Sequence, residues 1–270
     1  MTDLTEFYSS YHDEIIDKRF ASPYPLRRYA HLQQYESVAA QVAEGQSVLD
    51  AGCGEGVLSV LMAKRGAVVT GCDLSVPNVE RARAYAVEAG VSVAFSVGDA
   101  AALPFPDKSF DVVVSSHVLE HLPDFDAGIK ELLRVSKGKV VIAVPTAFNG
   151  LSFVQLGGGW FFLKGLRSFA AFFIGAWRVL VALVTGADGV DETYAGSGMP
   201  HVFRFPFVVR SKIRAAGGTV VMQEASTLAL PYFTSLLPLG RFLDRFRRVP
   251  ILRSCGYGTT FVVTVDARTK

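Results

Sequence analysis

The residues best able to do chemistry lie in a glycine-rich turn, Asp50-Ala51-Gly52-Cys53-Gly54-Glu55-Gly56. An apolar pair, Val48-Leu49, precedes the turn, and residues 57–65 after it have a helix-like composition. Glycine permits positive φ and lets a ligand approach the main chain closely, and the following helix would point its N-terminus at that ligand. A carboxylate two residues before the first glycine would repel a phosphate. The turn therefore favours a cationic or amino-bearing ligand.

Two further acids end apolar runs of the same kind. Asp73 closes the run 68–72, where nucleotide-binding α/β folds place a ribose-binding carboxylate, and Asp99 follows the run 91–97. The glycine spacing also departs from the G-x-G-x-x-G of dinucleotide-binding proteins. The three acids and the turn together favour S-adenosylmethionine over NAD.

A second group of reactive side chains follows the apolar run 110–115. His117, Glu120 and His121 share one face of a helical segment, and His201 lies in a separate stretch, Pro-His-Val-Phe-Arg-Phe. A histidine (His121, His117 or His201) would suit a general base near neutral pH. The imidazoles and the carboxylate would also suit Zn²⁺, Mn²⁺ or Fe²⁺ better than Mg²⁺. A purely structural role is the third interpretation.

The elements that must position these side chains alternate between strands and helices. We expect strands near 47–50, 67–72, 91–97, 110–115 and 139–144, and helices near 56–65, 77–89 and 123–135. The strands are continuous apolar runs, as expected when helices cover both faces of a parallel sheet. This pattern predicts an α/β, Rossmann-like, doubly wound sheet. A helix at 206–216 and strands at 219–223 and 259–265 would complete it.

Residues 45–146 resemble the class I S-adenosylmethionine-dependent methyltransferases, and are most similar to the group that contains the ubiquinone O-methyltransferases. The motifs that carry the resemblance are VLDAGCGEG, CDLS and GDAAALPFPDKSFDVVVSSHVLEHL. The resemblance implies a seven-stranded, mostly parallel sheet and S-adenosylmethionine as cofactor.

The resemblance also implies a role for each matched residue. Asp50 and the backbone of the glycine turn would hold the methionine end, Asp73 both ribose hydroxyls, and Asp99 the adenine amino group. The implied cofactor-binding residues are Asp50, Ala51, Gly52, Cys53, Gly54, Asp73, Leu74, Asp99, Ala100, Ser115 and His117, with Tyr11 and Arg28 from the N-terminal segment.

Some relatives bind a divalent metal through Glu-x-x-Glu-His and a further histidine. Here His117 replaces the first glutamate, and Glu120, His121 and His201 match the rest. We expect no metal, and a site formed by these four residues is the alternative.

Two segments interrupt the α/β pattern. Residues 160–185 are apolar except for Lys164, Arg167 and Arg178, which cluster on one side of a helix. This pattern suits a helix lying in a membrane interface, or else a lid or dimer face over the substrate. Residues 239–253 contain five arginines against one aspartate, which suits anionic headgroups, or else a solvated helix.

The chain has 270 residues and a net charge of +2, so global charge does not indicate nucleic acid. We divide it into an N-terminal helical cap (1–44), a cofactor-binding core (45–146), a hydrophobic helical insertion (147–199) and a C-terminal completion of the sheet (200–270) with a second insertion at 231–254. We expect residues 186–198 to form a loop. The three cysteines lack metal or disulfide spacing, and the N-terminus lacks a signal-peptide pattern. These features predict a cytoplasmic protein, peripheral on the membrane face if the insertions bind lipid.

The expected function is methyl transfer to a hydrophobic, membrane-associated acceptor: a lipid, a quinone-like ring or a lipid-linked sugar. The alternative is a soluble small-molecule O- or N-methyltransferase whose insertion acts as a lid. A third hypothesis is that the protein binds the cofactor but serves in assembly rather than in catalysis. No nucleic-acid partner is expected, and the chain would act as a monomer or homodimer.

Overall fold

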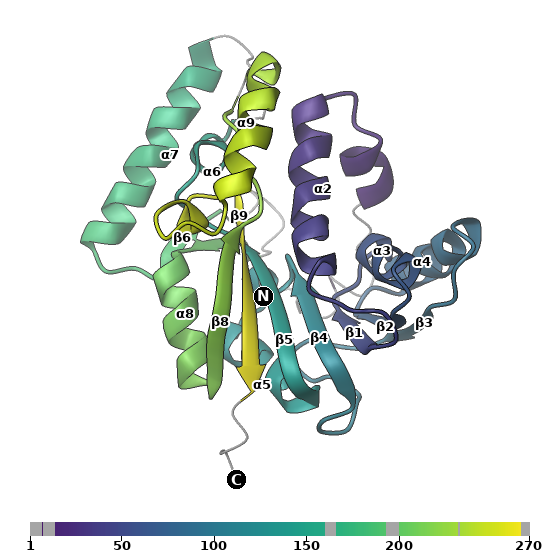
Figure 1. Cartoon of the computed structure of the whole chain (residues 1–270). Helices are drawn as coiled ribbons and strands as arrows, with labels where there is room; N and C mark the ends of the chain where they lie inside the picture. The colour runs from purple at the N-terminus through teal and green to yellow at the C-terminus, as the bar shows by residue number, and fades with distance from the viewer. Residues whose placement is uncertain (1–6, 8–13, 160–165, 193–199, 232, 266–270) are drawn as a thin grey trace.

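The computed structural model describes residues 7, 14–159, 166–192, 200–231 and 233–265, and its centre is a seven-stranded sheet (Figure 1). The strand order is β3-β2-β1-β4-β5-β9-β8. The strands are β1 (Ser47–Ala51), β2 (Val68–Asp73), β3 (Ala94–Val97), β4 (Phe110–Ser116), β5 (Ser136–Pro145), β8 (Gly218–Ala225) and β9 (Gly258–Val265). The first five pair in parallel, and β9 runs antiparallel to both of its neighbours. This confirms the doubly wound, mostly parallel sheet.

Helices cover both faces of the sheet and extend beyond one of its ends. They are α2 (Pro25–Ala39), α3 (Val57–Lys64), α4 (Val76–Glu88), α5 (Phe125–Val135), α6 (Gly150–Leu156), α7 (Leu166–Val184), α8 (Pro206–Ala215) and α9 (Leu237–Leu243). Shorter helical turns are η1 (Ile16–Phe20), η2 (Leu119–His121), η3 (Thr234–Leu236), η4 (Asp244–Phe246) and η5 (Leu252–Ser254).

Alternating side chains of each strand enter two different cores. In β4, Val113 packs with Ile129 of α5 and Ile213 of α8, whereas Val112 packs with Met62 of α3 on the opposite face. Because both faces are covered, the strands are apolar throughout rather than alternating. Because of this continuous apolar character, the strands could be predicted from the sequence.

Two strands begin three residues away from the predicted start. The third strand was expected from residue 91, but β3 begins at Ala94, because the N–H of Val91 instead donates to the carbonyl of Ala86 and closes the end of α4. The fifth was expected from 139, but β5 begins at Ser136, which pairs with Phe110 across a β-bulge.

The segments outside the core pattern build a third apolar cluster over the carboxyl end of the parallel strands. Leu26 of α2, Leu151 of α6 and Val179 of α7 pack there with Phe203. Phe203 belongs to β7 (Val202–Arg204), which pairs with β6 (Gly189–Asp191). Residues 189–191 are therefore a strand inside the stretch that was expected to be a loop. In Figure 1, α2, α7 and α9 all extend beyond this end of the sheet.

The hydrophobic insertion forms two helices where the sequence suggested one. An ideal Cβ at Gly175 of α7 would lie 1.8 Å from the carbonyl oxygen of Phe153 in α6, so the helices cross in backbone contact. Lys164 lies outside the described residues. Among those described, no helix has both the length and the apolar character needed to cross a bilayer.

Candidate functional site

A cavity of about 710 Å³ lies at the carboxyl ends of the parallel strands. One part of the cavity is lined by residues predicted to bind the cofactor, which are Gly52, Cys53, Gly54, Asp73, Leu74, Asp99 and Ala100. Asn78 and Ser116 line the same part. The rest of the lining includes His117, Glu120, His121, Leu151, Val154, Gln155, Glu192, His201, Phe203 and Tyr257. One cavity therefore joins the glycine turn to the histidine cluster and to apolar side chains of α6.

The glycine turn has a left-handed backbone conformation that favours glycine. Gly52 has φ +78°, and an ideal Cβ there would lie 2.2 Å from Cγ2 of Val118. Gly54 has φ +51°, and its N–H donates to Oδ2 of Asp73 over 2.8 Å. The side chain of Val118 thus packs where a side chain at Gly52 would lie, and the turn links β1 to β2.

Asp73 is held as an acceptor for hydroxyl groups. Its Oδ1 accepts from the N–H of Ser75 over 2.9 Å, and Oδ2 accepts from Gly54. Burial raises the pKa of Asp73 above its usual value, although these backbone N–H groups oppose the shift. Each carboxylate oxygen keeps a further lone pair, so Asp73 can take the two hydroxyls of a ribose.

Asp50 lies behind the cavity rather than on its wall. It is 1% exposed, and its Oδ2 accepts from the hydroxyl of Ser59 in α3 over 2.6 Å. Burial raises the pKa of Asp50 to about 7. The structure therefore gives Asp50 no direct contact with the cavity.

Three other implied cofactor residues differ from expectation. Ala51 and Ser115 are buried in strands, and Ser116 lines the cavity instead of Ser115. The guanidinium of Arg28 donates to the carbonyl of Ser22 and does not line the cavity. Arg19 and Arg27 are the arginines on its wall. Tyr11 lies outside the described residues.

These donors and acceptors fit S-adenosylmethionine. Buried Oδ1 of Asn78 and Oγ of Ser116 have no hydrogen-bond partner in the described part of the chain, although both residues line the cavity. Such atoms are rare unless a ligand satisfies them. A carboxylate at Asp73, polar groups at Asn78 and Asp99, and the backbone of the glycine turn on the cavity wall match a ribose, an adenine and an amino-acid end.

His117 joins the two halves of the cavity. It has φ +58°, which is uncommon for a residue with a side chain and is typical of strained positions at functional sites. Its Nδ1 lies 3.2 Å from Oε1 of Glu120, while its buried Nε2 has no hydrogen-bond partner among the described residues.

Three of the four residues of the predicted cluster are brought together, and His117 is not among them. Ligand atoms of Glu120, His121 and His201 all lie within 4.8 Å of one another, and the two imidazole rings stack with centroids 4.8 Å apart. Burial favours the protonated form of Glu120, but the hydrogen bond from His117 and the nearby imidazoles outweigh it and lower its pKa to about 2. Burial lowers the pKa of His121.

The protonation of His121 follows from its partner. Its Nδ1 lies 2.9 Å from the carbonyl oxygen of Pro200, which can only accept, so Nδ1 carries the proton. In the neutral ring Nε2 then holds the lone pair. The arrangement can accept a proton from a hydroxyl group placed in the cavity.

Sequence reasoning missed a polar chain on the insertion side. The hydroxyl of Tyr257 donates to Gln155 over 2.7 Å, and the amide of Gln155 donates to Glu192 over 3.0 Å. Oε2 of Glu192 lies 3.3 Å from Nδ1 of His201. These residues carry no local motif, and only the fold brings them together.

Comparison with known proteins agrees with this geometry. A family model described as a methyltransferase domain matches residues 49–144. The ubiquinone biosynthesis O-methyltransferase of Pseudomonas fluorescens (strain Pf0-1) is 33% identical over 162 residues, which are 56% of this chain and 69% of that protein. The enzyme of the same name from Chelativorans sp. (strain BNC1) is 39% identical over 108 residues, 40% of this chain. The chain spans only 43% of the Chelativorans protein's length.

A solved structure supports the fold. Magnesium protoporphyrin IX methyltransferase from Synechocystis PCC 6803 aligns with TM-score 0.58 and 17% identity, over 98% of this chain and all of that one. The chain belongs to the class I S-adenosylmethionine-dependent methyltransferases, and S-adenosylmethionine is its cofactor.

Proposed function

We propose that this protein transfers a methyl group from S-adenosylmethionine to a hydroxyl of a hydrophobic, quinone-like acceptor held at a membrane. The observation that supports it most is the single cavity that joins the Asp73 end to the His121–His201 pair and to apolar Leu151 and Val154. The two ubiquinone O-methyltransferase relatives favour an oxygenated aromatic ring as acceptor. We propose residues 45–146 as the cofactor half and 147–199 as part of the acceptor half.

When bound, S-adenosylmethionine supplies an electrophilic methyl group on a sulfonium. The chain's own contribution is to align the acceptor oxygen with that methyl group. His121 Nε2 would accept the hydroxyl proton, so that the oxygen attacks as it loses the proton, and Pro200 holds the ring by its Nδ1. The carboxylate of Glu192, which lies 3.3 Å from Nδ1 of His201, would offset part of the positive charge that His121 gains.

The metal alternative uses the same residues, because Glu120, His121 and His201 also suit a divalent cation. Dialysis against a chelator is expected to leave methyl transfer unchanged, since His121 acts as the base. Metal content and activity would be measured before and after dialysis. If dialysis abolishes activity and Mn²⁺ or Zn²⁺ restores it, these residues bind a metal and His121 is not the general base.

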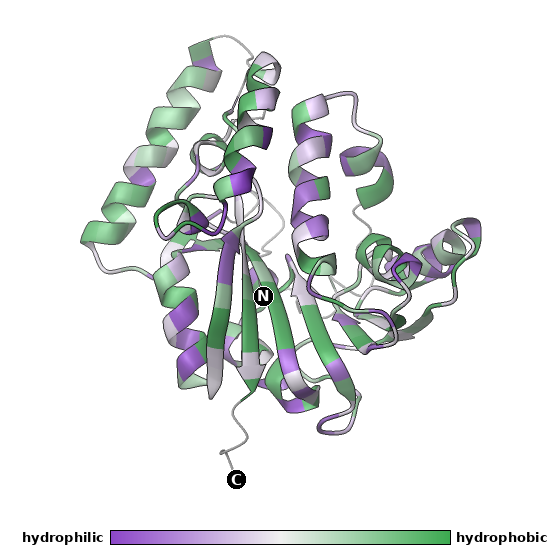
Figure 2. Cartoon of the chain, viewed as in Figure 1, coloured by the Kyte–Doolittle hydropathy of each residue, from purple (hydrophilic) through white to green (hydrophobic). Residues whose placement is uncertain are grey.

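Membrane contact through α7 is supported by the face that this helix leaves bare. Phe173 is 67% exposed and Trp177 65% exposed, and Leu180 and Val184 are exposed beside them. Figure 2 shows α7 as largely apolar along its length, and α7 contains no acidic residue. No described residue of α7 lines the cavity, so its outer face is better suited to a bilayer than to a lid.

The double variant Phe173→Ser/Trp177→Ser is therefore expected to bind lipid vesicles more weakly, on the order of 30-fold, because two large apolar side chains no longer leave water. Co-sedimentation with vesicles would measure the affinity. Val87→Ser, on the exposed face of α4, is the matched control and should not change it. Equal binding of the double variant and the wild type would contradict membrane contact through α7.

A further inference from the structure

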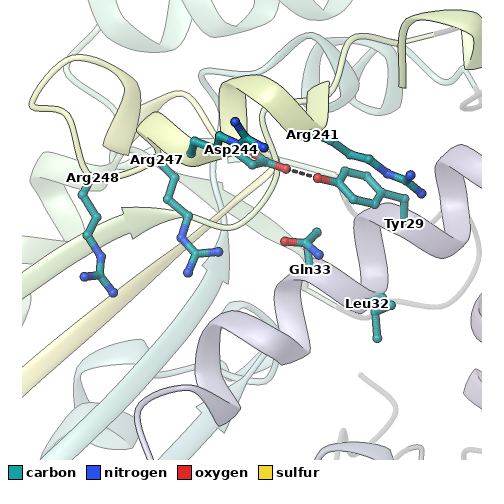
Figure 3. Close-up of a pocket in the computed structure, with 8 residues that line it drawn as sticks. Tyr29, Leu32, Gln33, Arg241, Asp244, Arg247 and Arg248 are labelled. Atoms are coloured by element: carbon teal, nitrogen blue, oxygen red, sulfur yellow. Dashed lines mark hydrogen bonds between the residues drawn. The ribbon is translucent and has the colours of Figure 1, made fainter. Parts of the chain in front are cut away.

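A second cavity, of about 720 Å³, lies between α2 and the segment formed by α9 and η4 (Figure 3). We call it the arginine cavity; its lining residues are Tyr29, Leu32, Gln33, Arg241, Asp244, Arg245, Arg247 and Arg248. None of them lines the cavity that contains the glycine turn and the histidine cluster. We propose that the arginine cavity binds a phosphate group, and that this phosphate is the headgroup of an anionic phospholipid.

The four arginines outnumber the carboxylates that face them. Arg247 and Arg248 both pair with one oxygen of Glu224, at 3.3 and 2.7 Å, and Glu224 is completely buried. Two guanidinium groups thus share a single carboxylate, which leaves a positive charge uncompensated.

The other carboxylate of the cavity is already engaged by neutral donors. Oδ1 of Asp244 accepts from the N–H of Leu228 over 2.7 Å, and Oδ2 accepts from the hydroxyl of Tyr29. Figure 3 shows this Tyr29–Asp244 bond across the cavity, with Arg241 beside the tyrosine ring. The guanidinium of Arg241 lies 5.4 Å from the centre of that ring. Asp244 therefore fixes the wall of the cavity, and Asp244 and Glu224 together offset only two of the four arginine charges.

Arg241 and Arg245 are the arginines left to hold an anion. In the part of the chain that the structure describes, neither forms an ion pair with a carboxylate, and both are exposed. A guanidinium presents several N–H donors in a plane and binds phosphate oxygens in pairs. Gln33 of α2 adds an amide on the opposite wall (Figure 3).

The surroundings of the cavity favour a lipid as the source of the phosphate. Exposed apolar residues alternate with the arginines in the same segment: Leu236, Leu239, Phe242, Phe246, Val249 and Ile251. A site for a free phosphate ester would have no use for them, whereas apolar side chains beside a basic site suit the headgroup and acyl boundary of a bilayer. α9 extends beyond the same end of the sheet as α7 (Figure 1). The inference deepens the proposed membrane contact, on which it rests for the lipid source.

The test uses the full chain without methyl donor, so its result does not depend on methyl transfer. The variant Arg241→Gln/Arg245→Gln removes the two unpaired guanidiniums and leaves the pairs with buried Glu224 intact. Binding would be measured to vesicles of phosphatidylcholine alone, to vesicles of phosphatidylcholine with phosphatidylglycerol, and to pyrophosphate in solution. We expect the variant to lose affinity for the phosphatidylglycerol vesicles by about 25-fold, from two arginines near an anionic surface.

Arg210→Gln/Arg214→Gln on α8 is the control, because it removes the same charge away from the cavity. Its affinity should stay within about threefold of wild type at matched salt, since distant charges are screened. If the cavity variant loses pyrophosphate binding but not vesicle binding, the lipid source is overturned and a soluble phosphate replaces it. If the cavity variant matches the wild type with both ligands, the phosphate site itself is overturned.

Discussion

Replacing Asp73 by asparagine is expected to weaken the binding of S-adenosylmethionine by on the order of 100-fold. The carboxylate already accepts from Gly54 and Ser75, and it keeps one lone pair on each oxygen for a ribose hydroxyl. An asparagine keeps one acceptor oxygen and loses about one hydrogen bond to a charged acceptor, worth roughly 1.5–3 kcal/mol, or about 10- to 160-fold. Isothermal titration calorimetry with the cofactor or its demethylated product would measure the loss.

The folded protein should tolerate this change. Burial raises the pKa of Asp73, so the free protein holds the charged carboxylate at a cost that a neutral side chain avoids. Glu80→Gln, an exposed position on α4, makes the same change in charge and should leave affinity within about twofold. If the Asp73→Asn variant binds S-adenosylmethionine as tightly as the wild type, Asp73 does not bind the ribose.

Replacing His121 by asparagine is expected to lower kcat by about 10²- to 10⁴-fold, the usual contribution of a general base. The amide nitrogen of asparagine can occupy the position of Nδ1 and keep the hydrogen bond to Pro200, but the variant has no basic nitrogen at Nε2. The ring lies on the side of the cavity proposed for the acceptor, so the affinity for S-adenosylmethionine should not change. Initial-rate kinetics with a phenolic acceptor and calorimetry of the same preparation would separate the two effects.

A fall in cofactor affinity equal to the fall in kcat would contradict this assignment, because it would make His121 a structural residue. Full activity of His121→Asn would move the base to His117 or His201.

The core of the fold could be predicted because its sequence signals are local. Strands buried on both faces are continuous apolar runs, and Gly52 and Gly54 have a conformation that few other residues adopt. The position of Asp73 also followed from the end of a strand. Asp50 could not be placed, because its contact with Ser59 depends on how α3 returns over β1.

The proposed acceptor half of the site depends on contacts between distant parts of the chain. His121 bonds to Pro200, 79 positions away, and Gln155 bonds to Tyr257, 102 positions away. No spacing in the sequence encodes such pairs. The division of the hydrophobic insertion into α6 and α7 was missed for a similar reason, since it depends on the close packing of Gly175 against Phe153.

The most direct test is the transfer of an isotopically labelled methyl group from S-adenosylmethionine to a prenylated phenol carried in phospholipid vesicles. The wild-type chain should place the label on the phenolic oxygen, and the Asp73→Asn variant should do so far more slowly at a limiting cofactor concentration. If the wild-type chain binds the cofactor but no label reaches the phenolic oxygen, the proposed union of cofactor and hydrophobic acceptor in one cavity is contradicted.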